Sequence, residues 1–181
     1  MHIVALLLAA GGSITGKVSA TPEKYLKDTV VYVKQAPGET APKTLSMDQK
    51  GMEFRPHILV AAVGDTVKFL NNDGVDHNVY SPDGDAYNLG VFPKGQSRDK
   101  KFDKAGVYTQ LCSIHPEMLA YVFVGQNRYA AAVEKDGSFK IEGVPPGTYT
   151  VAVWNPKLKA DEASVTVEAG KAAKAEFALA R

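Results

Sequence analysis

The sequence contains a single cysteine, Cys112, among 181 residues. A disulfide within the chain is therefore excluded, and so is any metal site that needs two thiolates. The sequence also lacks an excess of charge of either sign, because 21 Lys and Arg stand against 20 Asp and Glu. A balanced charge gives no reason to expect nucleic acid or an anionic membrane surface as a partner.

Long hydrophobic runs are absent as well. No run approaches the roughly 18 apolar residues of a membrane span, so no membrane span is expected. One short apolar run, Ile3–Ala10, stands at the N-terminus and is followed by Gly11-Gly12. Its length suits the core of a secretion signal, although Met1-His2 before it carry no positive side chain. We interpret residues 1–12 as a signal-peptide remnant of an exported protein, and a buried first strand is the alternative.

After Gly12, short runs of β-branched and aromatic residues alternate with Gly, Pro, Asn and Asp turns. Such regular short strands are typical of all-β sandwiches and not of α/β folds. The Ala- and Lys-rich segment Ala169–Ala180 is the one helix-like stretch, and we predict a strand in its second half. The main expected strands are Ser13–Val18, Thr29–Val33, Phe54–Val60, Thr66–Leu70, His77–Ser81, Gly106–Cys112, Leu119–Val124, Phe139–Glu142, Thr148–Trp154 and Ser164–Val167.

The segment Leu111–Met118 reads LCSIHPEM and places a thiolate, an imidazole and a thioether at the spacing C-x2-H-x2-M. A second imidazole, His77, lies upstream. Cys112, His77 and His115 with a weak axial Met118 are the ligand set of a mononuclear type 1 (blue) copper site. Thiolate and thioether favour Cu(I) whereas imidazole serves both oxidation states, so such a site changes little when an electron is transferred.

The spacing of these residues would also let one short loop bring three side chains to a single metal. Cys112 would end a strand with its sulfur pointing inward, and a short turn would return His115 to the same metal. Pro116-Glu117 would do the same for Met118, so that one loop supplies three ligands. The residues leave three alternatives open, namely an inert buried thiol, a zinc site of one Cys and two His, and a Cys112–His115 nucleophilic pair. Glu117 is an alternative axial ligand.

On these residues the sequence resembles the cupredoxins, and the short ligand loop looks most like that of amicyanin. Further marks of the resemblance are Val63–Val67 (VGDTV), Asn71-Asn72-Asp73 and Lys104–Tyr108 (KAGVY). The resemblance implies a Greek-key β-sandwich over residues 45–127. It also implies that Asn78 and Ser113 support the ligands, through hydrogen bonds that tie the ligand loops together and reach the thiolate.

Two residues depart from the plastocyanin pattern. Gln110 is expected to point inward, where an apolar aromatic is usual, and Leu111 replaces the Tyr that could carry electrons beside the cysteine. The remaining electron route is the exposed edge of His115. We expect an apolar rim around it, formed by Val75, Phe92-Pro93, Pro116 and Leu119. The basic run Lys94–Lys104 is expected to be a solvated edge strand, with docking of an acidic partner as the alternative.

Residues 128–181 contain a second pattern, Asp136–Tyr149 (DGSFKIEGVPPGTY), which resembles carboxypeptidase regulatory-like (transthyretin-like) β-sandwich domains. The first strand of that family resembles Gly12–Val18 (GSITGKV). We therefore expect residues 13–44 to complete this second sandwich, which is split by the inserted cupredoxin domain. The expected role of the second sandwich is that of a scaffold, with binding or docking as the alternative.

Together, these features predict a periplasmic one-electron carrier with one mononuclear copper site that is not an enzyme in its own right. Its expected partners are redox proteins, a dehydrogenase or a cytochrome, that dock near His115. Two other functions remain open: copper delivery or storage, and adhesion or docking with a structural copper site.

Overall fold

The computed structural model describes residues 11–38 and 41–181, and the segment Ile3–Ala10, expected to be a secretion signal, lies outside them. The elements in chain order are β1 (Gly12–Ala20), the 3-10 helix η1 (Glu23–Asp28), β2 (Val30–Val33), β3 (Thr44–Gln49), β4 (Phe54–Arg55), β5 (Ile58–Ala62), β6 (Thr66–Asn71), β7 (His77–Ser81), β8 (Tyr87–Phe92), β9 (Ser97–Lys101), β10 (Gly106–Leu111), β11 (Leu119–Gly125), β12 (Ala130–Ala132), β13 (Ser138–Val144), β14 (Gly147–Trp154), β15 (Ala163–Val167) and β16 (Ala172–Leu179). Within the described residues, no helix has the length and apolarity needed to cross a membrane.

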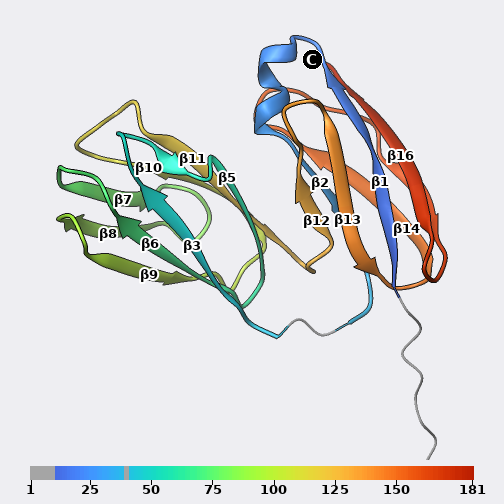
Figure 1. Cartoon of the computed structure of the whole chain (residues 1–181), viewed down its shortest axis with the longest axis horizontal. Coiled ribbons are helices and arrows are strands. Elements are labelled where there is room, and N and C mark those ends of the chain that lie inside the picture. Colours follow the sequence, from blue (N-terminus) through green and yellow to red (C-terminus); the bar gives the residue numbers. More distant parts are fainter. Residues whose placement is uncertain (1–10, 39–40) are drawn as a thin grey trace, which may run out of the picture. The chain divides into compact units, whose positions relative to one another are not determined.

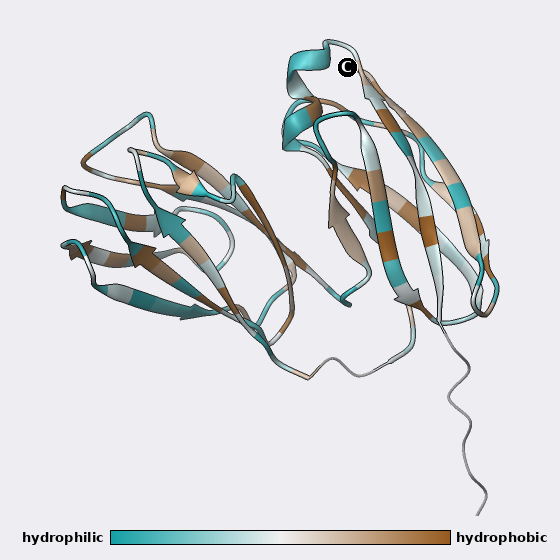
Figure 2. Cartoon of the chain, viewed as in Figure 1, coloured by the Kyte–Doolittle hydropathy of each residue, from teal (hydrophilic) through white to brown (hydrophobic). Residues whose placement is uncertain are grey.

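The prediction of an all-β chain is confirmed. Along β13, for example, buried Phe139 and Ile141 alternate with exposed Lys140 and Glu142, and Figure 2 shows this alternation in hydropathy. A period of two residues is what a strand with one buried face requires. The helix-like segment Ala169–Ala180 contains β16 instead of a helix, because its alternate side chains are buried.

The described chain divides into two compact units, and the first consists of residues 11–37 and 133–181. In this unit β1 lies between β13, to which it is antiparallel, and β16, to which it is parallel. Figure 1 shows this N-terminal strand in blue beside the red C-terminal strand. In the second sheet of the unit, β14 pairs with both β2 and β15. The first strand of the chain is thus a central strand among C-terminal ones.

The second unit, residues 38–132, is a Greek-key sandwich of two sheets. Their strand orders are β5-β11-β10-β7-β8 and β4-β3-β6-β9. Met47 and Phe69 from one sheet and Val79 and Val122 from the other belong to one buried hydrophobic cluster, so the sheets pack face to face. Within this sandwich, β10 pairs with β7 and with β11, and the loop between β10 and β11 therefore lies next to the start of β7.

A buried ion pair joins the two ends of the second unit. The Asp65 carboxylate, whose side chain is fully buried, accepts two hydrogen bonds from Arg128, at 2.8 and 2.7 Å. It also accepts the backbone N–H groups of Lys43 and Ala62, and Arg128 donates to the carbonyl of Ala41. Since these contacts reach residues 41–43 and 128, the unit extends a few residues beyond the expected bounds of 45–127.

This ion pair yields a stability prediction. Burial alone would raise the pKa of Asp65, but the hydrogen bonds from Arg128 and from two backbone N–H groups hold it below its usual value. We expect Arg128→Ala to lower the free energy of unfolding of the second unit by about 2–4 kcal/mol at pH 7, because it leaves a buried charge without its cation. Urea denaturation measures this, and Arg55→Ala, which removes an exposed cation paired with Glu53, is the matched control.

The pH dependence of that loss has a defined sign. The pKa of Asp65 is lower in the folded protein than in the unfolded chain, where it is about 3.9. The ion pair therefore makes its full contribution to the free energy of unfolding above that pH, and the contribution disappears as the pH falls through the pKa of the folded state. The stability gap between the wild-type protein and Arg128→Ala should therefore narrow in acid. A gap that is constant from pH 7 to pH 2 would contradict this account.

A second prediction concerns the placement of β1 between β13 and β16. A Cβ atom added to Gly16 would lie 1.6 Å from the carbonyl oxygen of Ala175 in β16. We expect Gly16→Ala to destabilise the first unit by at least about 1–3 kcal/mol, since the two strands would have to move apart. Thermal unfolding checks this, and Ser19→Ala, at an exposed position of the same strand, should be nearly neutral. Equal melting temperatures for both variants would argue against this strand arrangement.

Candidate metal centre

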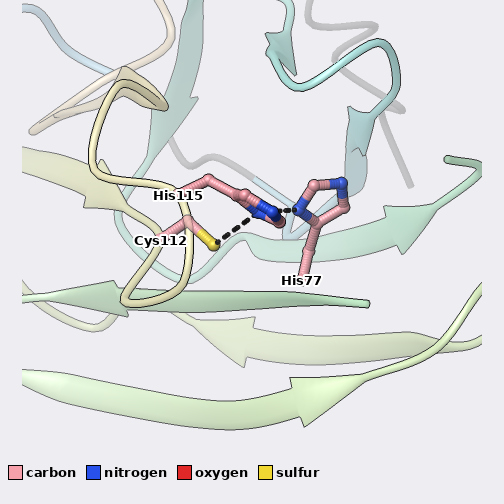
Figure 3. Close-up of side chains that lie close together, drawn as sticks. All are labelled: His77, Cys112 and His115. Carbon is pink, nitrogen blue, oxygen red and sulfur yellow. Dashed lines mark hydrogen bonds between the residues drawn. The ribbon is translucent and has the colours of Figure 1, made fainter. Parts of the chain in front are cut away.

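Three side chains with metal-binding atoms converge at one end of the second unit. His77 is the first residue of β7, Cys112 directly follows β10, and His115 lies in the loop that leads to β11. The Nδ1 atoms of His77 and His115 are 3.0 Å apart, and Cys112 Sγ lies 3.8 Å from His115 Nδ1. Figure 3 shows both imidazoles and the sulfur pointing toward one another. All three ligand atoms lie within 4.8 Å of one another.

This geometry fits a single metal ion. Zinc, for example, binds imidazole nitrogen at about 2.0–2.1 Å and thiolate sulfur at about 2.3 Å. One ion with such bond lengths can reach three donor atoms at the observed separations. His77 is fully buried and Cys112 is 3% exposed, whereas His115 is partly exposed. The donor set of two imidazoles and one soft thiolate is suited to copper and also to zinc.

The ligand loop is held closed at its base. Leu111 at the end of β10 pairs with Leu119 at the start of β11, and the Met118 N–H donates to the carbonyl of His115 at 3.0 Å. The side chain of Met118 is 1% exposed and belongs to the same hydrophobic cluster as Cys112. The structure thus brings His77, Cys112 and His115 together and buries Met118 in the same hydrophobic cluster as the cysteine.

Asn78 connects β7 to this loop at two points. Its backbone N–H lies 3.4 Å from Cys112 Sγ, and its side-chain oxygen accepts the N–H of Ser113 at 3.2 Å. Its side-chain nitrogen donates to Asn88 on the neighbouring strand β8 at 2.8 Å. A donor aimed at sulfur stabilises the thiolate, and a loop tied in this way keeps the sulfur in place.

The carboxylate of Asp73, a residue not predicted to belong to the site, also reaches His77. Its Oδ2 lies 3.0 Å from His77 Nε2 and accepts the backbone N–H of Met52 at 2.8 Å. Its Oδ1 accepts the N–H of Gly74. The hydrogen bonds from Met52, His77 and Gly74 hold the pKa of Asp73 well below its usual range, so the carboxylate is ionised at neutral pH. The only sequence signal for this contact is an acidic residue four positions before His77.

The inward-pointing Gln110 has its hydrogen-bond partners inside the unit. The hydroxyl of Tyr87 on β8 donates to its side-chain oxygen at 2.5 Å, and its side-chain nitrogen donates to the carbonyl of Tyr108. Burial raises the pKa of Tyr87, against the opposing effect of the bond to Gln110, so the hydroxyl remains protonated. The buried amide of Gln110 on β10 is thus satisfied by a tyrosine from β8, which lies on the far side of β7 in the same sheet.

The apolar rim expected around His115 is partly wrong. Phe92 is fully buried, because it pairs with His77 across β8 and β7 and enters the hydrophobic cluster. Its neighbour Val91 is 51% exposed and lies opposite Asn78. The other large apolar side chains exposed in this region are Val75, Ile114 and Leu119. Strand alternation therefore exposes Val91 in place of Phe92.

Comparisons with known proteins support the fold of the second unit. Residues 41–125 match the family model described as copper binding proteins, plastocyanin/azurin family. Pseudoazurin of Methylorubrum extorquens is 39% identical over 101 residues, and the match covers 51% of this chain and 66% of that protein, a little under two thirds of its length. The segment over residues 41–125 therefore has the cupredoxin fold.

Two solved structures are also similar. A purple cupredoxin from Nitrosopumilus maritimus is 28% identical with a TM-score of 0.42, and the match covers 45% of this chain and 99% of that one. A reduced amicyanin variant is 28% identical with a TM-score of 0.43, and the match covers 54% of this chain and 98% of that one.

A second family model, described as polysaccharide lyase family 4, domain II, matches residues 119–175. This match begins at the start of β11 in the second unit and ends within β16, and it does not include β1. The resemblance of residues 128–181 to carboxypeptidase regulatory-like domains stays a prediction.

The role of Asn78 can be tested at Ser113. We expect Asn78→Ala to speed the hydrogen–deuterium exchange of the Ser113 amide about tenfold in copper-free protein, because that N–H loses an acceptor worth about 1–2 kcal/mol. Asn88→Ala is the matched control, since it removes the neighbouring contact but leaves the bond from Ser113 to Asn78 intact. Similar exchange at Ser113 in the two variants would mean that the side chain of Asn78 does not hold the loop.

Proposed function

We propose that the protein is a type 1 copper protein that carries single electrons, with His77, Cys112 and His115 as strong ligands and Met118 as the weak axial ligand. The observation that supports this most directly is the convergence of two Nδ1 atoms and one Sγ atom within 4.8 Å. Of the proposed ligands, Cys112 and Met118 are both buried members of the hydrophobic cluster of this unit. A soft thiolate, two imidazoles and a thioether match copper better than zinc, for which Met is a poor ligand.

The residues around the ligands suit rapid electron transfer. Bound copper would supply the one-electron change between Cu(I) and Cu(II). The backbone N–H of Asn78 stabilises the negative charge on the Cys112 sulfur, and the side chain of Asn78 holds Ser113 and with it the ligand loop. Ligands held in this way move little between the two oxidation states, so little energy is spent on reorganisation.

His115 is the proposed point of electron entry and exit. It is the one partly exposed residue of the three clustered ligands, and Ile114 beside it is 45% exposed. A small apolar surface around an exposed ligand suits brief docking of other redox proteins, because short-lived complexes bury little area. We propose a dehydrogenase as electron donor and a cytochrome as acceptor. The reaction needs no substrate pocket, and the protein is proposed not to be an enzyme in its own right.

We further propose that the protein works outside the cytoplasm, in the periplasm of its cell. The support for this is the apolar run Ile3–Ala10 followed by two glycines, together with the pseudoazurin relative. The first unit, which contains β1 and the C-terminal strands, is proposed to be a scaffold for the copper-binding unit. Copper delivery is a weaker proposal, because His77 and Cys112 are buried and a delivered ion needs an accessible site.

The proposal predicts a distinctive spectrum. Full-length protein loaded with Cu(II) should show an intense blue absorption band and a narrow copper hyperfine splitting in electron paramagnetic resonance. Both should disappear in Cys112→Ser, because the band arises from charge transfer from the thiolate. Met118→Leu should keep the band, shift it and raise the reduction potential, because the thioether donates weakly to Cu(II).

A histidine outside the site, His57, provides a control. His57 lies next to Tyr121, so His57→Gln should leave the spectrum unchanged, whereas His77→Gln should abolish it. A colourless protein that binds Zn²⁺ more tightly than copper would overturn the electron-carrier proposal and favour a zinc site. An ordinary Cu(II) spectrum that survives in Cys112→Ser would also overturn it.

A further inference from the structure

The carboxylate of Asp73 is the acidic group in contact with the buried histidine of the metal centre. Its Oδ2 lies 3.0 Å from His77 Nε2, the ring nitrogen that does not face the other ligands. The His77 side chain is fully buried, and the Asp73 side chain is 18% exposed. The other ring nitrogen, Nδ1, is the one that lies 3.0 Å from His115 Nδ1. The imidazole is thus held from both sides.

The direction of this hydrogen bond determines where the ring proton lies. An ionised carboxylate can only accept hydrogen bonds, so the hydrogen must be on Nε2. A neutral imidazole carries a single ring proton, and Nδ1 is then left with its lone pair free. Asp73 therefore selects the tautomer in which the Nδ1 atom of His77, which faces Cys112 and His115, is unprotonated and can bind a metal through its lone pair.

The position of Asp73 is itself fixed by the loop between β6 and β7. Its backbone N–H donates to the side-chain oxygen of Asn71, a fully buried residue whose nitrogen donates to the carbonyls of Val75 and Phe92. Its Oδ2 also accepts the N–H of Met52 in the turn between β3 and β4. The carboxylate is thus anchored before any metal binds.

Met52 adopts a left-handed backbone conformation, with φ at 61°. This conformation is unusual for a residue other than glycine. In this conformation its N–H reaches Asp73 Oδ2 at 2.8 Å. The contact joins the β3–β4 turn to the oxygen that also faces His77.

We propose that Asp73 is a positioning residue for the metal centre: it fixes the ring and tautomer of His77 and, through its negative charge, lowers the reduction potential of the site. The proposal rests on the proposed copper function for its second part only. A carboxylate that accepts the second N–H of a ligating imidazole makes that ligand more basic. A more basic ligand and a nearby negative charge both stabilise Cu(II) relative to Cu(I).

The first test uses copper-loaded protein. Asp73→Asn keeps an oxygen that can accept hydrogen bonds but removes the charge, so the fold should be retained. We expect the preference for Cu(II) over Cu(I) to fall about tenfold, which for one electron is an increase of about 59 mV in reduction potential. The matched control is Asp76→Asn, which removes an exposed carboxylate from the same loop, one residue before His77. Equal potentials in the two variants would overturn the electrostatic part of the proposal.

The second test needs no metal. Nitrogen-15 NMR of the histidine rings in copper-free, full-length protein should find the proton of His77 on Nε2. In Asp73→Ala this preference should be lost, and copper should then bind at least tenfold more weakly. An unchanged tautomer in Asp73→Ala would overturn the positioning role. If the wild-type protein failed to give a blue site, the proposed function would fall while the ring measurement would still decide the role of Asp73.

Discussion

The contact between the start of β7 and the end of β10 is the constraint on which the metal centre depends. It places His77 close to Cys112. Asn78, the residue after His77, precedes Cys112 by 34 positions along the chain. Asn78 uses both its backbone and its side chain here, one toward the sulfur and one toward Ser113. Without this contact the ligand loop would hold only the donors that lie close together in sequence.

Support for the site is distributed over the whole second unit. At one end, Asp73 joins His77 to the β3–β4 turn, so that a ligand and a remote turn share one carboxylate. Near the termini of the unit, Asp65 and Arg128 fasten the first and last segments to each other. The unit also has one buried hydrophobic cluster, which includes Cys112 and Met118. A donor set supported in this way is suited to a reaction in which the ligands hardly move.

The two units differ in whether their residues are continuous along the chain. The second unit is continuous in sequence, whereas the first contains a strand from the N-terminus between strands from the C-terminus. Gly16 lets β1 approach β16 closely, because a side chain there would collide with the neighbouring backbone. A unit that closes only when both ends of the chain are present is suited to carry an inserted domain, which agrees with its proposed role as a scaffold.

The all-β class and the convergence of Cys112 and His115 followed from the sequence alone, because strand alternation and the C-x2-H-x2-M spacing act over a few residues. Other features depended on which strands meet, and local patterns carry no information about that. The partner of Gln110 is Tyr87 from β8, two strands away in the same sheet. The register of β7 with β8 buries Phe92 and exposes Val91. The contact of Asp73 with His77 likewise depends on a loop anchored by distant residues. Only the tertiary structure could decide these points, since each is a contact between segments far apart in sequence.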